Sequence, residues 1–427
     1  MSTDHKRVAV VGAGIVGVCT ALMLQSRGFH VTIIDRHPPG EGASFGNAGC
    51  FNGSSVVPMS MPGMITIVPR WLFDPMGPLS IRFSYLPRLT PWLIRFLLAG
   101  RQSKVKEQAK ALRSLLNTTV PLITSLADEA GARHLIRHEG HLYVYRTEKG
   151  FTKDNGGWEL RRLNGISTQV LDSAALRDFD PNLSHAFTKG ILIEENGHTT
   201  NPHRLVTLLL DKVVANGGKF VNAHVTGFVI VGHVLQSIST TTADIAVDAA
   251  VIAAGAHSKS LAASLGDYVP LDTERGYHIV IKDPEATPRI PTTDAEGKFI
   301  ATPMETGLRI GGTVELAGLS APPNWRRAHV LLKQARNLLP GLAPGSSENR
   351  YTKWMGFRPS VPDSLPVIGR SRLTPDVIYA FGHGHVGMTG APMTATLVCE
   401  LIAGEKPSID ITPFAPARFS TAHVSPD

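Results

Sequence analysis

The chain of 427 residues is 43% hydrophobic and 18% charged, which predicts a folded protein with two domains or a discontinuous pair and excludes extensive disorder. Its formal net charge of +7 and its pI of about 9.3 favour anionic surfaces or ligands, without choosing between nucleic acid, a membrane surface and a small acid. The three cysteines, Cys19, Cys50 and Cys399, are far apart, which suits a reducing compartment rather than a disulfide framework.

The apolar segments are too short to cross a membrane. The longest candidate, Trp92–Gly100, is interrupted by Arg95, whereas a spanning helix needs about 20 apolar residues. The first strand is reached by Val8, which leaves no room for a signal peptide before it. We therefore expect a cytoplasmic protein, held at most at the surface of the inner membrane.

Residues 8–17 read VAVVGAGIVG, an apolar β-branched run that leads into a glycine-rich turn. Gly12 permits the tight turn, Gly14 lets the backbone approach a pyrophosphate, and Gly17 lets a helix pack against the strand. We expect this helix over 18–27 with its end near Gly28. The pattern predicts a strand, a turn and a helix that bind a dinucleotide.

A second strand is predicted over 29–34, and Asp35 follows it, 18 residues after Gly17, where an acid accepts the ribose hydroxyls. An acid at this position argues against the 2′-phosphate of NADP, so NAD and FAD both remain. The residues predicted to bind the cofactor in this unit are Gly12, Ala13, Gly14, Ile15, Val16, Gly17, Asp35 and Arg36.

Three later segments continue the nucleotide-binding fold. A loop rich in Gly, Ser and Asn over 37–55 replaces the βα units that an NAD enzyme would show, and it can lie along a long cofactor. Residues 244–258 predict a buried strand that returns to the first sheet. A strand over Val377–Phe381 leads through GHGHVGMTG into a helix predicted from about Pro392 to Ala403, which forms a second glycine-preceded helix N-terminus.

These segments together resemble the FAD-dependent D-amino-acid oxidase superfamily, and within it the D-amino-acid dehydrogenase and glycine oxidase branch. The resemblance rests on VVGAGIVG with Asp35, SFGNAG, VIAAGAHS, GFRPSVPDSLPVIG and GHGHVGMTGAP, which cover both ends and the middle of the chain. It implies FAD as the cofactor. The further cofactor contacts that it implies are Ser44, Asn47, Ala48, Gly49, Val225, Ala254, Gly255, Gly384, His385, Val386, Gly387, Met388 and Thr389.

The fold class implied is α/β (α+β): a Rossmann-like FAD-binding domain built from separate segments, with an antiparallel-sheet substrate domain. The division predicted is 1–60, 196–265 and 351–427 for the FAD-binding domain, and 61–195 and 266–350 for the substrate domain. Strand-like stretches at 275–281, 299–303 and 308–313 suit an antiparallel sheet over the flavin.

Arg358 is the leading candidate for substrate binding. It lies in the extended segment GFRP, where prolines restrict the backbone and an arginine can present a planar fork to a carboxylate. In amino-acid-oxidising relatives the arginine of this motif binds the substrate carboxylate. The alternative is an arginine that braces the loop through Asp363.

Four other residues are weaker candidates. Tyr277 follows a turn glycine, where relatives place a pocket residue, and its hydroxyl could support the carboxylate; it could equally be a core tyrosine. His383 and His385 form an HxH pair that suits flavin contact better than metal binding, because no third ligand stands out, and His383 is taken as a catalytic candidate. Cys50 borders the predicted flavin loop, and covalent flavin attachment stays open.

The segment 70–106 is basic and aromatic. It reads either as a lid or surface helix packed on the body, or as a shallow membrane-docking element in which Trp71, Phe73, Trp92 and Phe96 enter the interface. The second reading suits an enzyme that passes electrons to a membrane quinone.

We predict FAD-dependent oxidative deamination of a D-amino acid to an imino acid, then to a keto acid and ammonia, as a dehydrogenase. The close alternative is an oxidase or dehydrogenase of a cyclic or N-methyl amino acid, such as proline, hydroxyproline, sarcosine or glycine. The electron acceptor, a quinone or O2, is open. Two alternatives come from other classes of protein: a tRNA-modifying flavoprotein and a non-catalytic FAD-binding protein. The sequence shows no RNA-binding motif, so we expect no nucleic-acid partner. We also expect no bound metal.

Overall fold

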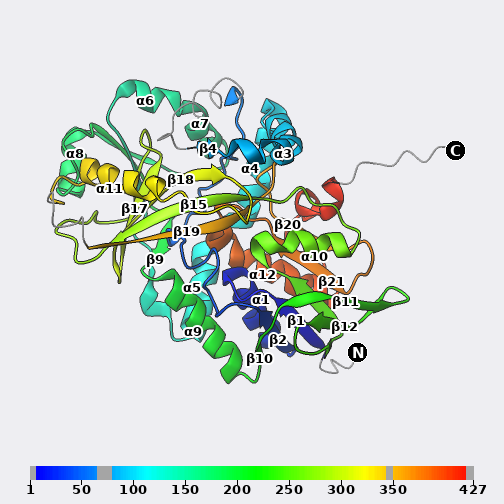
Figure 1. The fold of residues 1–427 in the computed structure, drawn as a ribbon. Helices are drawn as coiled ribbons and strands as arrows, with labels where there is room; N and C mark the ends of the chain where they lie inside the picture. Colours follow the sequence, from blue (N-terminus) through cyan, green and yellow to red (C-terminus); the bar gives the residue numbers. More distant parts are fainter. Residues whose placement is uncertain (1–5, 65–78, 343–349, 420–427) are drawn as a thin grey trace.

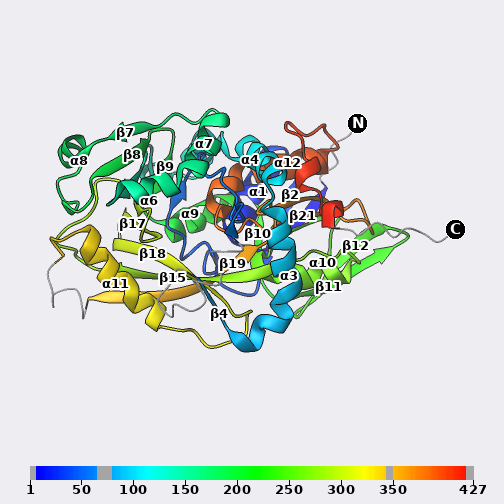
Figure 2. The ribbon, with the colours of Figure 1, turned by 90° about the horizontal axis from the view of Figure 1, so that it is seen from above.

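Two large sheets form the body of the molecule and face each other across its centre (Figure 1). The computed structural model describes residues 6–64, 79–342 and 350–419. Seen from above, the mainly antiparallel sheet and its helices lie at one end and the mainly parallel sheet with its helices at the other, while α3 (Leu86–Ala99) crosses the side of the molecule (Figure 2).

The first sheet is parallel except at one edge, as expected for a nucleotide-binding unit. Its order is β10 (Lys219–Asn222), β2 (His30–Asp35), β1 (Arg7–Val11), β14 (Ala249–Ile252), β21 (Val377–Phe381) and β20 (Val367–Arg370). Only β20 runs antiparallel, to β21. The central strands β1 and β14 are buried on both faces, which explains their continuous apolar runs.

Four helices pack on one face of this sheet and share a single apolar core with it. They are α1 (Ile15–Ser26), α12 (Gly387–Ala403), α9 (Pro202–Ala215) and α5 (Thr119–Glu129). Helix α5 lies in the segment that the sequence assigned to the substrate domain, yet Val120 and Ile123 belong to the same core as Val8. The other face of the sheet carries α10 (Ser258–Ser264) and the strands β11 (Val225–Val231), β12 (Val234–Thr240) and β13 (Ile245–Ala246).

The second sheet is mainly antiparallel and has nine strands. Its order is β19 (Tyr351–Ser360), β15 (Asp272–Ile281), β18 (Gly307–Leu316), β17 (Phe299–Met304), β16 (Thr292–Asp294), β6 (His141–Tyr145), β8 (Lys189–Ile193) and β7 (Gln169–Leu171), with β4 (Leu79–Ile81) beside β18. Helix α11 (Arg326–Leu338) covers one face, where it packs on apolar residues of β15 and β18. The other face borders the central cavity.

The remaining elements are short or peripheral. A small sheet joins β3 (Cys50–Phe51), β9 (Gly197–Thr199) and β5 (Ile136–Arg137). The other helices are α3 (Leu86–Ala99), α4 (Gln102–Leu116), α6 (Glu148–Lys153), α7 (Asn155–Leu163) and α8 (Ser173–Phe179). The short 3₁₀ helices are Phe83–Tyr85, Arg133–Leu135, Gly255–His257, Thr412–Phe414 and Pro416–Phe419.

The predicted fold class is confirmed, and so are the strands near 244–258, 275–281, 299–303, 308–313 and 377–381. Two helix starts are wrong. Helix α1 begins at Ile15 rather than Val18, and α12 begins at Gly387, so that Pro392 lies inside it.

The predicted domain division also needs correction at two places. Residues 351–360 form β19, which pairs along its whole length with β15 and so belongs to the second sheet. The core that α5 shares with β1 places part of 61–195 with the nucleotide-binding unit. Both errors arise because strand pairing and helix packing over long sequence separations leave no local signal.

Candidate functional site

A cavity of about 1360 Å³ lies between the two sheets. It extends from the carboxyl ends of β1, β2, β14 and β21 to the exposed face of the second sheet. Pockets for single small ligands measure about 300–1000 Å³, so this cavity has room for a ligand of dinucleotide size together with a smaller molecule.

The glycine-rich turn after β1 forms one end of the cavity. Gly12 has φ +117°, and a Cβ there would lie 2.4 Å from the carbonyl oxygen of Ala253. A Cβ on Gly17 would lie 1.9 Å from the Gly12 oxygen, so α1 can approach the strand only with glycine there. Helix α1 has no acidic residue in its first turn. Its first backbone N–H groups lack intrahelical acceptors, which suits a diphosphate.

Side-chain hydrogen bonds fix this end of the site. The N–H of Ile15 donates to Oγ of Ser44 at 3.0 Å. The N–H groups of Ala13 and His37 donate to the two carboxylate oxygens of Asp35 at 2.8 and 2.9 Å. A carboxylate offers about four acceptor positions, so Asp35 is held in place and keeps acceptors for ribose hydroxyls.

The N-terminus of α12 forms a second backbone cradle, and Thr389 connects it to the loop after β2. The N–H of Asn52 donates to Oγ1 of Thr389 at 3.2 Å, and that hydroxyl donates to the carbonyl of Cys50 at 3.2 Å. The hydroxyl of Thr119 donates to the Thr389 carbonyl at 2.7 Å. Burial raises the pKa of the Cys50 thiol to about 12, so it is protonated near neutral pH and is not a reactive thiolate.

The loop 44–49 is held from the opposite sheet by residues that the sequence analysis did not identify. Arg309 on β18 donates to the carbonyls of Phe45 and Asn47 at 3.0 and 2.5 Å, and its burial lowers its pKa to about 10. His278 donates through Nδ1 to the Gly46 carbonyl at 3.2 Å and stacks on Trp354. The second sheet therefore fixes the loop that borders the cofactor end of the cavity.

Arg358 lies on the cavity face of β19 and has no hydrogen bond or ion pair with any residue that the structure describes. Its guanidinium lies over Gly276 of the neighbouring strand, where a Cβ would stand 2.4 Å from the guanidinium carbon. Burial lowers its pKa, and the nearby Glu274 opposes this shift. Asp363, the alternative partner, is paired with Arg418 at 2.8 Å. Arg358 is therefore a half-buried cation that is available to an anionic ligand in the cavity.

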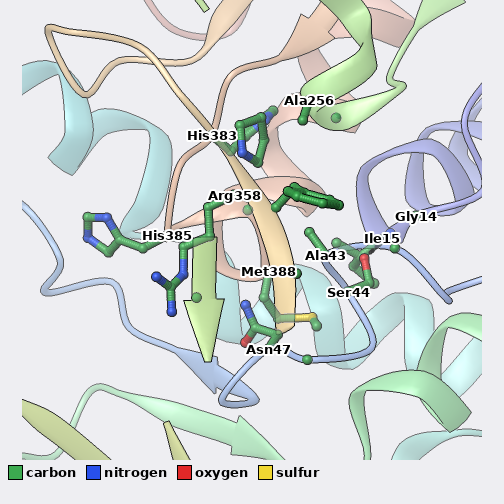
Figure 3. Close-up of a pocket in the computed structure, with 18 of the residues that line it drawn as sticks. Gly14, Ile15, Ala43, Ser44, Asn47, Ala256, Arg358, His383, His385 and Met388 are labelled. Carbon is green, nitrogen blue, oxygen red and sulfur yellow. Dashed lines mark hydrogen bonds between the residues drawn. The ribbon is translucent and has the colours of Figure 1, made fainter. Parts of the chain in front are cut away.

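His383 and His385 border the same cavity, and Figure 3 places His385 beside Arg358. Nε2 of His383 lies 2.9 Å from Oγ1 of Thr394. Burial lowers the pKa of the His383 imidazole to about 4. The His385 side chain is exposed at the cavity, where partial desolvation and the nearby Arg358 lower its pKa. Both side chains are neutral near pH 7.

Tyr277 borders the cavity, but its hydroxyl is engaged elsewhere. It donates to the carboxylate of Glu315 and accepts from the N–H of Asn324 at 2.9 Å. Residues alternate between the two faces of a strand, and Gly276 faces Arg358, so the Tyr277 side chain lies on the other face, against Trp325. The predicted contact between Tyr277 and a substrate carboxylate is therefore corrected: Tyr277 is a core residue.

Most residues predicted to bind the cofactor border the cavity. Those that do are Gly12, Ala13, Gly14, Ile15, Val16, Asp35, Arg36, Ser44, Asn47, Ala48, Val225, Ala254, Gly255, Gly384, His385, Gly387, Met388 and Thr389. Three do not. Gly17 packs against Gly12, Gly49 lies against the Thr199 carbonyl, and Val386 is buried in a separate apolar cluster. Figure 3 shows Gly14, Ile15 and Ser44 across the cavity from Arg358.

The end of the cavity at Arg358 has no acidic side chain among the residues that the structure describes. The carboxylates that border the cavity are Asp35 and Glu41, both near the glycine-rich turn. At the other end lie Asn52, His141, Tyr143 and Thr293, with Asn52 Nδ2 3.1 Å from His141 Nδ1. None of these four belongs to a local motif, so the sequence offered no signal for them.

A family model described as FAD dependent oxidoreductase (DAO) matches residues 7–401. A curated D-amino-acid oxidase from Bradyrhizobium diazoefficiens is 43% identical over 97% of this chain and 99% of that protein. A D-amino acid dehydrogenase from Rhizobium rhizogenes is 27% identical over 97% of this chain and all of its own length. Two solved structures are similar in fold. Glycine oxidase from Geobacillus kaustophilus has a TM-score of 0.72 and 21% identity, with coverage of 97% of this chain and 100% of that one. L-proline dehydrogenase from P. horikoshii has a TM-score of 0.74 and 20% identity, with coverage of 97% of this chain and 98% of that one.

The buried histidines predict acid-dependent stability. In the unfolded chain a histidine has a pKa near 6.5, whereas the buried His383 has a pKa of about 4 and the buried His278 has a pKa of about 3. Between pH 6.5 and 4 the unfolded state therefore binds more protons, and the free energy of unfolding falls as the pH falls. Each histidine contributes a slope of up to about 1.4 kcal/mol per pH unit.

Chemical denaturation from pH 7.5 to 4.5 measures this slope. We expect His383→Gln, whose amide can still bond to Thr394, to reduce it by the contribution of one proton. An unchanged slope in this variant would show that His383 titrates normally in the folded protein.

Proposed function

This chain belongs to the DAO family of FAD-dependent oxidoreductases, and on that basis we propose that it oxidises a D-amino acid whose carboxylate binds Arg358. The observation that carries the proposal is a half-buried guanidinium that faces the cavity and has no hydrogen bond or ion pair with any described residue. The choice of a D-amino acid rests on the relatives, since the two curated relatives reported above are named for D-amino acids. Their names include both oxidase and dehydrogenase, so the acceptor, O2 or a quinone, is tested separately below.

The residues present fit FAD. The cradle for a dinucleotide has three parts. Two helix N-termini are free of acidic residues, Gly12 lies where any Cβ would collide with the Ala253 carbonyl, and Asp35 is anchored by backbone N–H groups. We infer that Gly12–Val16 and Ser44 hold the pyrophosphate, that Asp35 holds the ribose, and that Gly384–Thr389 and Asn47 hold the flavin. When bound, FAD supplies the acceptor for a hydride.

The residues of the chain act by binding and by electrostatics. Arg358 can hold the carboxylate through two parallel N–H···O bonds, which fixes the orientation of the Cα–H bond. Its positive charge, with neutral His383 and His385 around it, disfavours a second cation in the cavity. The substrate ammonium therefore loses its proton more readily, and oxidation of the neutral amine needs no strong base. The imino acid product hydrolyses in water to a keto acid and ammonia.

Anaerobic reduction of the flavin tests this proposal. We expect its visible absorbance to bleach with at least one D-amino acid in a panel of D-, L-, N-methyl and cyclic amino acids. Removing one member of a buried charge pair costs about 2–5 kcal/mol, so Arg358→Met should lower kcat/KM about 30-fold or more. Gly276→Ala should act in the same direction, because its Cβ displaces the guanidinium.

Two controls make the outcome specific. Tyr277→Phe should lower stability while KM stays the same, because it removes a hydrogen bond from the buried Glu315 and leaves that carboxylate only its longer ion pair with Arg275, at 3.7 Å. Arg204→Met removes an exposed arginine and should change neither stability nor KM. Flavin that dithionite reduces but that no amino acid bleaches would contradict the proposal. The rates at which O2 and a soluble quinone reoxidise the reduced flavin then distinguish oxidase from dehydrogenase.

We also propose that α3 contacts a membrane surface, with different residues from those first expected. Trp92 is buried and stacks on the half-buried Phe96, so neither enters an interface, and Trp71 and Phe73 lie outside the described residues. The exposed apolar side chains along this helix and the turn before it are Phe83, Leu86, Ile94 and Leu98. Exposed Arg88, Arg101 and Lys104 flank them, as in helices that lie on anionic lipid. Among the described residues, no helix is long and apolar enough to cross a membrane.

Cosedimentation with lipid vesicles tests the contact. We expect binding to vesicles that contain anionic lipid, weaker binding to zwitterionic vesicles, and a loss of several-fold with Phe83→Glu or Ile94→Glu. Val170→Glu, at an exposed apolar residue of β7, is the matched control and should bind normally. Equal binding by all variants would contradict the proposal.

A further inference from the structure

Strand β18 carries one residue more than its neighbour where it passes Arg358. Gly276 of β15 pairs with Val314, and the next residue, Tyr277, pairs with Gly312. Thr313 is therefore the extra residue of a β-bulge. Bulges are frequent next to active sites, where they turn a side chain in a new direction.

The backbone of Thr313 is strained. Its φ of +61° lies in the left-handed region, which a β-branched residue rarely adopts. Glycine is the residue that fits such a position, and glycines occupy the two preceding places, 311 and 312. The presence of threonine rather than a third glycine at this strained position indicates that the threonine side chain has a role that glycine could not fill. Strain of this kind is concentrated at functional sites.

The position of the side chain suggests what that need is. Thr313 borders the cavity, on the strand next to Gly276, over which the Arg358 guanidinium lies. The residue is 7% exposed, and its hydroxyl has no hydrogen-bond partner among the described residues. A hydroxyl that is buried without a partner is unfavourable, and a bound ligand can supply one. Rotation about the Cα–Cβ bond exchanges the hydroxyl with the methyl group, so the hydroxyl can turn toward the cavity.

We propose that Thr313 is a substrate-binding residue whose hydroxyl donates a hydrogen bond to the carboxylate held by Arg358. This inference rests on the proposed function. A carboxylate has about four acceptor positions, and the arginine fork occupies two of them. Thr313 supplies a further donor from the neighbouring strand, and the bulge is what brings this side chain to the cavity.

Three substitutions separate the hydroxyl from the strain. Thr313→Ser keeps the hydroxyl, Thr313→Ala removes it but keeps a Cβ at positive φ, and Thr313→Gly removes both hydroxyl and strain. The matched control is Thr273→Ala. Thr273 is also a buried threonine with an unpartnered hydroxyl, but it does not border the cavity.

The first readout is the affinity of the FAD-loaded protein for propionate, which has a carboxylate but no amine to oxidise, followed by perturbation of the flavin absorbance. Loss of a hydrogen bond to a charged group predicts a Kd about tenfold higher in the Ala and Gly variants. The Ser variant and Thr273→Ala should keep the wild-type Kd, and KM for the substrate should follow the same pattern. An unchanged Kd in Thr313→Ala and Thr313→Gly would overturn the inference.

The second readout is thermal stability. Because glycine fits the left-handed conformation, Thr313→Gly should raise the unfolding midpoint by about 1–3 °C while it weakens propionate binding. A residue with a purely structural role would not lose affinity as it gained stability. A lower midpoint would show that threonine is not strained there and would overturn the argument from strain.

Wild-type and Arg358→Met proteins distinguish failure of this inference from failure of the proposed function. If propionate perturbs the wild-type flavin and Arg358→Met abolishes the effect, the carboxylate site stands, whatever Thr313 does. If wild-type protein neither binds propionate nor is reduced by any amino acid, both fall.

Discussion

The site is organised around a guanidinium that the protein leaves without an acidic partner. Burying a charge is unfavourable unless it is paired, yet Arg358 lies at the cavity with no ion pair among the described residues. Glu274, opposite Arg358 on the neighbouring strand, accepts from the hydroxyl of Ser360 at 2.7 Å instead. Gly276 on the neighbouring strand leaves room for the guanidinium, while the Trp354 ring fills the space over Gly356. An anionic ligand would supply the negative charge that Arg358 lacks, whereas a neutral ligand would not.

The same sheet that carries this cation also fixes the cofactor end of the cavity. Arg309 and His278 bind carbonyls of the loop 44–49, and the N–H of Gly384 donates to the Pro359 carbonyl at 2.7 Å, one residue after Arg358. The segment before α12 is therefore attached to the strand that holds Arg358. The cofactor site and the proposed carboxylate site are thus parts of one connected frame, although their residues come from both ends and the middle of the chain. Such a frame can hold a Cα–H bond in one orientation relative to the cofactor, which is where positioning contributes most to the rate.

The sequence was informative where function depends on local geometry. The turn at Gly12, the acid at Asp35 and the GFRP segment are contiguous motifs, so their places at the cavity could be predicted. Tyr277 was misjudged because the face of a strand to which a side chain points depends on its pairing, and here Glu315 of β18 takes its hydroxyl. Arg309 and Thr313 could not be found, because their roles come from contacts across the two sheets and from a one-residue bulge. The exposed face of α3 was also misassigned, since Trp92 packs inward and Leu86, Ile94 and Leu98 are the apolar residues that face out.

The most direct test of the central claim is a crystal structure of the FAD-loaded protein with an unreactive carboxylate bound. The account predicts two N–H···O bonds of about 2.7–2.9 Å between the Arg358 guanidinium and the carboxylate, with the guanidinium still over Gly276. A carboxylate bound elsewhere in the cavity, with Arg358 turned into an ion pair with Glu274, would contradict it.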